Sequence, residues 1–84
     1  MTKKVACVGI LVADVMASPV DSVPERGMLS QVNAITLHSG GNAMTASINL
    51  TKMGVDAKIV GKVGSDMFGA YLRDCLKKAG VDTR

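Results

Sequence analysis

The 84-residue sequence has very few aromatic side chains: one Phe, one Tyr and no Trp. Proteins that bind single-stranded nucleic acid stack bases on aromatic rings, so this composition gives nucleic-acid binding little support. The net charge is only +3, and the basic residues are scattered apart from Lys3-Lys4 and Lys77-Lys78. With so few rings, a core must be built from Val, Ile, Leu, Ala and Met.

Cysteines and long apolar runs are also scarce. Cys7 and Cys75 lie in neither a C-x-x-C nor a metal-ligand spacing. They could form one bridge, but buried thiols in a reducing compartment are the favoured interpretation. The apolar run from Val5 to Ala13 follows two lysines like a secretory signal, yet Asp14 interrupts it and it is far too short to span a bilayer. We therefore expect a cytoplasmic protein without a membrane segment.

Sequence motifs for nucleotide phosphates are absent as well. There is no P-loop lysine motif, no G-x-G-x-x-G and no second acidic cluster for magnesium. Phosphoryl transfer needs positioned charge around the transferred group, which these residues do not supply. A small Rossmann-type nucleotide-binding protein is a weak alternative, because the phosphate fingerprint after the first strand is missing.

What the sequence does contain is the alternation of an α/β fold. Hydrophobic residues make up 48% and charged residues 20%, which is typical of one small globular domain. Apolar periodicity and turn residues predict a strand, a turn-rich connection, an inserted strand, a helix, a second sheet strand and a second helix. A right-handed crossover would set the two sheet strands parallel. In chain order the six segments are Val5–Val12, Ser18–Met28, Leu29–His38, Asn42–Met53, Val55–Val63 and Met67–Ala79.

Both helices carry signals for their ends and faces. Ser39 or Asn42 could cap the first helix, and Gly54 should end it. Asp66 is well placed to cap the second, which should end at Gly80. The predicted buried faces are Ala43, Ala46, Leu50 and Met53 on the first helix, and Phe68, Leu72, Cys75, Leu76 and Ala79 on the second.

A candidate binding site lies where the first helix begins. Gly40 and Gly41 let the backbone turn tightly and approach a ligand, and the free N–H groups of a helix N-terminus suit an oxygen-rich one. A simple turn is the alternative. Asp14 should stand at the carboxyl end of the first strand, where α/β sheets place ligands, and its carboxylate can accept bonds from sugar hydroxyls. Its alternative role is a turn or helix cap.

Together these motifs resemble the N-terminal signature of the ribokinase-like (PfkB) carbohydrate kinases. The segment Val5–Asp14 and the G-x-D-x-x-G at Gly64–Gly69 are similar to that family, and the small residues fall at its spacing: Gly40-Gly41, Ala43, Ala46-Ser47, Gly54 and Gly64. The resemblance implies a three-layer α/β/α fold with a parallel sheet and an inserted β lid. Residues 1–84 would be the N-terminal portion of such a domain, with the lid at about 16–38.

The resemblance also implies a function, the ATP-dependent transfer of the γ-phosphate to a hydroxyl of a sugar or nucleoside. Asp14, Gly40, Gly41 and Asn42 match positions that bind the acceptor, and Thr45 stands where the signature usually has asparagine. ATP and Mg²⁺ are expected for a full-length parent, whose catalytic residues lie in a G-A-G-D region that these residues lack.

Alone, the chain should therefore be inactive, and no catalytic residue is assigned to it. The lone His38 is interpreted as a residue at the edge of the lid, whose strands mediate homodimer contacts in some family members. Because Val12 replaces an asparagine of ribokinase itself, ribose is not favoured as the substrate. The alternative function is a non-catalytic sugar- or nucleoside-binding module.

Overall fold

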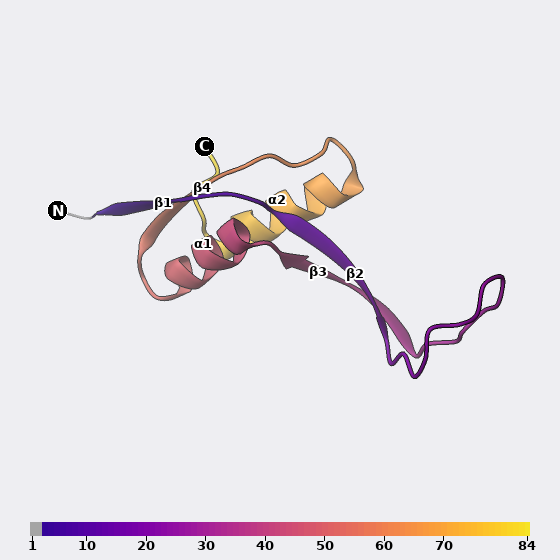
Figure 1. Ribbon diagram of the computed structural model, residues 1–84. Helices are drawn as coiled ribbons and strands as arrows, with labels where there is room; N and C mark the ends of the chain where they lie inside the picture. The colour runs from indigo at the N-terminus through magenta and orange to yellow at the C-terminus, as the bar shows by residue number, and fades with distance from the viewer. Residues whose placement is uncertain (1–2) are drawn as a thin grey trace.

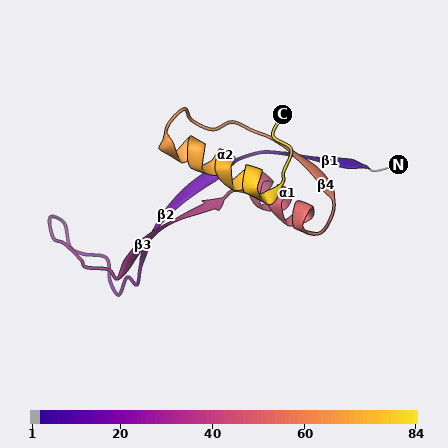
Figure 2. The same cartoon turned by 180° about the vertical axis from the view of Figure 1, so that it is seen from behind.

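The computed structural model describes residues 3–84, which form a small sheet with two helices and a long hairpin. Figures 1 and 2 show the hairpin and its connecting loop reaching away from the helices, on the side opposite the N-terminus. The molecule is consequently elongated, with extents of 58 × 26 × 19 Å. In chain order the elements are β1 (Lys4–Val8), β2 (Val12–Ser18), β3 (Ala34–Gly40), α1 (Asn42–Lys52), β4 (Asp56–Val60) and α2 (Met67–Ala79).

The sheet that carries the fold is a parallel pair, β1 and β4, in a register that runs from Lys4 opposite Asp56 to Val8 opposite Val60. Parallel pairing requires a crossover, and α1 is part of it, as the sequence predicted. Beyond α2 the chain returns to the outer side of β4, where the Ile59 N–H donates to the Asp82 carbonyl at 3.0 Å. Asp82 thus forms a parallel bridge with Lys58 and marks a third strand position.

One face of this sheet packs against both helices. Cys7 and Ile59 are cross-strand partners on that face, and they belong to one buried cluster with residues of α1, α2 and the C-terminal segment. On the other face Val8 is 73% exposed. The cluster consists of Cys7, Ala43, Met44, Ile59, Leu72, Leu76 and Val81.

The first predicted strand is wrong in one respect, because Val5–Val12 is not continuous. β1 ends at Val8, and after a short link Val12 begins β2, which pairs antiparallel with β3 from Val12 opposite Gly40 to Ser18 opposite Ala34. The sequence does not reveal this break, since both strands are built from the same types of apolar residue. β3 is also displaced from its predicted range, and β4 is shorter than Val55–Val63, because pairing partners limit both strands.

The second helix confirms its predicted ends. The Asp66 carboxylate accepts a hydrogen bond from the Gly69 N–H at 3.0 Å, and Gly80 ends the helix with a left-handed φ of 84°. Its predicted face is buried at Leu72 and Leu76, although Phe68 remains 40% exposed.

The first helix differs from its prediction at the cap and on the buried face. Neither Ser39 nor Asn42 caps it, since Gly41 is the N-cap and makes no side-chain bond. Ala46 is exposed, and Met53 is 76% exposed. The buried stripe instead contains Ser47, which becomes compatible with the core because its hydroxyl donates to the Met44 carbonyl at 2.9 Å.

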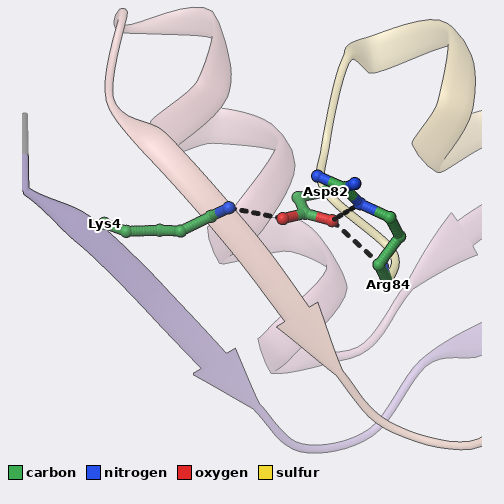
Figure 3. Close-up of polar contacts among 3 residues, drawn as sticks. All are labelled: Lys4, Asp82 and Arg84. Carbon is green, nitrogen blue, oxygen red and sulfur yellow. Dashed lines mark hydrogen bonds and ion pairs between the residues drawn. The ribbon is translucent and has the colours of Figure 1, made fainter.

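The C-terminal segment is fixed to the sheet by charged side chains, as Figure 3 shows. Lys4 Nζ on β1 reaches across to Asp82 Oδ2 at 2.5 Å, and the Arg84 N–H donates to Asp82 Oδ1 at 3.0 Å. The hydrogen bond from Lys4, followed by that from the Arg84 backbone, holds the pKa of Asp82 well below its usual value.

Within residues 3–84, neither helix is long and apolar enough to cross a membrane.

Candidate functional site

The site is built where the hairpin meets the start of α1. Gly40 is the last residue of β3 and lies opposite Val12, so Asp14 is its diagonal neighbour on the same face of the hairpin. A Cβ on Gly40 would lie 2.9 Å from Asp14 Oδ2. The carboxylate therefore occupies the space that any larger residue at position 40 would need.

Gly41 makes the turn that joins β3 to the helix. Its φ is 91°, a conformation that L-residues with a side chain rarely adopt, and a Cβ there would lie 2.5 Å from the Ile10 carbonyl oxygen. Gly9 permits a second close approach, because a Cβ on it would lie 3.2 Å from the Ala43 Cβ. The glycines thus bring the start of α1 directly against the link between β1 and β2.

The amino end of α1 retains donors for a ligand. The first intrahelical bond runs from the Thr45 N–H to the Gly41 carbonyl at 3.0 Å, and no side chain caps the N–H groups that precede it. Asn42 and Thr45, three residues apart, are both exposed, whereas Ala43 is buried. An amide, a hydroxyl and the positive end of a helix dipole are therefore available at the start of α1, directly after Gly40 and Gly41.

The structure places Asp14 in a different strand from the one predicted. It does not end a strand of the parallel sheet but lies within β2, two residues after that strand begins. The hairpin twists β2 away from the sheet, and its pairing with β3 returns Asp14 to Gly40. The structure brings the Asp14 carboxylate against Gly40, and Gly41, Asn42 and Thr45 follow Gly40 in the chain at the start of α1.

Two further polar side chains share the face of Asp14, and sequence reasoning missed their position. His38 lies directly opposite Asp14, and Thr36 Oγ1 is 3.0 Å from His38 Nε2. Alternation along a strand was the available signal, since Thr36 and His38 precede Gly40 by four and two residues.

A hydrogen bond from α2 anchors the backbone of β3. The Tyr71 hydroxyl donates to the Leu37 carbonyl at 3.1 Å. Hydrogen bonding with Cys75 raises the pKa of Tyr71 above its usual value.

A separate hollow lies elsewhere. It has a volume of about 340 Å³ and is bounded by the end of β4, α2 and the C-terminal segment, including Gly61, Arg73 and Thr83. None of the predicted acceptor-binding residues lines it. Its position beside β4, where the bridge of Asp82 ends, makes it a gap next to a sheet edge rather than a part of the site.

No metal centre accompanies these residues. Across residues 3–84, no three His, Cys, Asp or Glu side chains come together as ligands for an ion. The site therefore presents one carboxylate, polar side chains and backbone donors, which suit the hydroxyls of a sugar better than a phosphate chain.

The fold is that of a carbohydrate kinase family. Residues 2–84 match the model described as pfkB family carbohydrate kinase, and the chain belongs to that family. The sugar kinase PH1459 of Pyrococcus horikoshii is 34% identical over 80 residues, which cover 95% of this chain and 24% of the relative. The ATP-dependent ribose-1-phosphate kinase of Halopiger xanaduensis is 35% identical over 63 residues, or 75% of this chain and 21% of the relative.

Solved structures agree with the sequence relatives. A fructokinase from Xylella fastidiosa superposes with a TM-score of 0.76 at 31% identity, over 96% of this chain and 23% of its own. The crystal structure of PH1459 in complex with ATP gives a TM-score of 0.75 over 95% of this chain and 24% of that one. The chain thus has the ribokinase-like α/β fold that the sequence predicted, and it spans about a quarter of the length of these relatives.

Proposed function

We propose that this chain is the acceptor-binding part of an ATP-dependent carbohydrate kinase, which transfers the γ-phosphate of ATP to a sugar or nucleoside hydroxyl. The observation that carries the proposal is the contact of the Asp14 carboxylate with Gly40, beside the uncapped start of α1. The family to which the chain belongs supports the same reaction.

Each proposed residue has a distinct task in holding the acceptor. The Asp14 carboxylate accepts hydrogen bonds from hydroxyls, which fixes the orientation of the sugar ring. Gly40 and Gly41 let the ring approach the backbone, and the N–H groups at the start of α1 donate to its oxygens. The Asn42 amide both donates and accepts, and Thr45 adds a hydroxyl one turn further along the same helix.

The described residues do not fit ATP or Mg²⁺. They contain no phosphate-binding glycine motif, and residues 3–84 offer no cluster of metal ligands. In this proposal the nucleotide, the metal and the catalytic base are held by other residues of a full-length protein, and the 84-residue chain alone is inactive. Holding the acceptor in one orientation is then the contribution of these residues to the rate.

The proposal extends to the hairpin and to the surroundings of the protein. β2 and β3 would act as the lid over the acceptor, since Asp14 belongs to the hairpin itself. Val15 and Ile35, on the face opposite Asp14, are 59% and 69% exposed, which suits contact with the lid of a second copy. A cytoplasmic location agrees with the two free cysteines.

The test is the substitution Asp14→Asn in the full-length protein. Replacing the carboxylate by an amide keeps its size but weakens its bonds to hydroxyls, so KM for the acceptor should rise at least about ten-fold, since a charged hydrogen bond contributes about 1.5–3 kcal/mol. KM for ATP should stay unchanged. An unaltered acceptor KM would remove Asp14 from the site. Acceptor binding without any phosphoryl transfer in the wild-type protein would favour the binding-module alternative.

A further inference from the structure

Asp14 has a polar partner on the neighbouring strand. In the antiparallel register His38 of β3 lies directly opposite Asp14 of β2, so both side chains project from the same face of the hairpin. Directly opposed residues have Cβ atoms about 4.5–5.5 Å apart. Both side chains are exposed, and the face continues into Gly40 and the start of α1.

The two groups point away from each other along the strands. The Asp14 carboxylate lies toward Gly40, where a Cβ would be 2.9 Å from Oδ2. The His38 ring turns the other way, with Nε2 3.0 Å from Thr36 Oγ1. Among residues 3–84 no ion pair joins Asp14 to His38. The carboxylate and the imidazole are therefore not paired with each other, and both lie exposed on this face of the hairpin.

From this arrangement we infer that His38 is a second acceptor-binding residue and determines specificity by holding a different hydroxyl of the acceptor from those held by Asp14. The inference rests on the proposed function, because it needs an acceptor bound at Asp14. An acceptor lying on this face would place one hydroxyl at the carboxylate and another at the imidazole.

Thr36 is the positioning residue for this contact. Its bond to Nε2 fixes the ring and leaves Nδ1 without a partner among residues 3–84. In a neutral ring Nδ1 is a donor if Thr36 donates to Nε2 and an acceptor if Thr36 accepts from it, and in a protonated ring Nδ1 is a donor. A hydroxyl can pair with Nδ1 in every case, whereas an anionic group can pair with it only where Nδ1 is a donor. The geometry therefore favours a neutral hydroxyl as the group that His38 recognises.

The test combines variants with analogues of the acceptor in the full-length enzyme. The acceptor is the compound phosphorylated with the highest kcat/KM in a panel of D-ribose, D-fructose, D-glucose, 2-dehydro-3-deoxy-D-gluconate and adenosine, and its monodeoxy derivatives follow. His38→Ala should raise the acceptor KM about ten-fold with little change in kcat. For the wild type, the kcat/KM of one monodeoxy derivative should be about ten-fold below that of the acceptor itself. For His38→Ala the two compounds should have equal kcat/KM, because the hydroxyl that the derivative lacks has no partner in that variant.

Two further variants separate recognition from structure. Thr36→Val keeps the shape of the side chain but frees the ring, so it should weaken the same hydroxyl preference less than His38→Ala does. Asn33→Ala removes another exposed polar side chain, just before β3, and should leave the preference intact. Asp14→Asn should also lose the preference for one hydroxyl of the acceptor, but not for the same hydroxyl as His38→Ala.

The outcomes distinguish the two proposals. If Asp14→Asn loses acceptor affinity while His38→Ala keeps every hydroxyl preference of the wild type, the inference about His38 is wrong and the proposed function stands. If Asp14→Asn has no effect on the acceptor, or if no compound in the panel is phosphorylated, the proposed function fails and the role of His38 fails with it.

Discussion

Gly41 provides the sharpest test of how the site is built. In the variant Gly41→Ala, the new methyl group must adopt a φ of 91° and would lie 2.5 Å from the Ile10 carbonyl oxygen, 3.0 Å from the Ile10 carbonyl carbon and 3.1 Å from the Leu11 Cα. All three atoms are backbone, so no side chain can rotate away.

The expected cost has two parts that a matched variant separates. A left-handed conformation costs an L-residue about 1–2 kcal/mol, and forcing a methyl group against packed backbone adds roughly 1–3 kcal/mol. Gly54 has a similar φ of 87° but nothing within 4 Å of its Cβ position. Gly54→Ala should therefore lose only about 1–2 kcal/mol, and Gly41→Ala about 2–5 kcal/mol.

The measurement is equilibrium urea unfolding of the full-length variants, followed by circular dichroism. The midpoint of Gly41→Ala should fall clearly below that of Gly54→Ala, and its acceptor KM should rise because α1 must move away from the β1–β2 link. Equal midpoints for the two variants would show that the close approach of Gly41 to Ile10 does not exist.

Two more predictions concern Gly40 and Asp82. In Gly40→Ala the methyl group meets only the end of the Asp14 side chain, 2.9 Å away, and that side chain can rotate. The stability should therefore change little, while the acceptor KM should rise about ten-fold. An unfolding midpoint lowered as much as in Gly41→Ala would contradict this. The folded-state pKa of Asp82 lies below its ordinary value of 3.8, so its contribution to stability is present above about pH 4 and is lost as the pH falls through the folded-state pKa. In acid titrations of the unfolding midpoint, Asp82→Asn should be less stable than the wild type at pH 7, and the difference should shrink below pH 4; a constant difference would exclude the link to Lys4.

Local signals in the sequence were sufficient for α2. Asp66, Gly69 and Gly80 fix its ends through bonds and conformations within a few residues, and the observed bounds, Met67–Ala79, are those predicted. The diglycine was likewise recognised before helix α1, because positive φ and close approach belong to the glycine residues themselves. These features depend on chain neighbours, which a sequence displays directly.

Other features depend on partners far away in the chain. The run Val5–Val12 does not reveal that it divides between a parallel and an antiparallel sheet, because Val12 becomes part of β2 only through its pairing with Gly40. The buried face of α1 could not be predicted either, since Ser47 is acceptable in the core only when its hydroxyl reaches the Met44 carbonyl.

The sequence by itself determined the alternation of strands and helices apart from the break between β1 and β2, the ends of α2, and the family-like positions of Asp14 and the two glycines. Only the tertiary structure decided that Asp14 belongs to the hairpin, that its carboxylate fills the space beside Gly40, and that His38 stands opposite it. The reason is that strand register is set by pairing between residues 16 to 28 positions apart, and a shift of one residue would turn His38 to the other face.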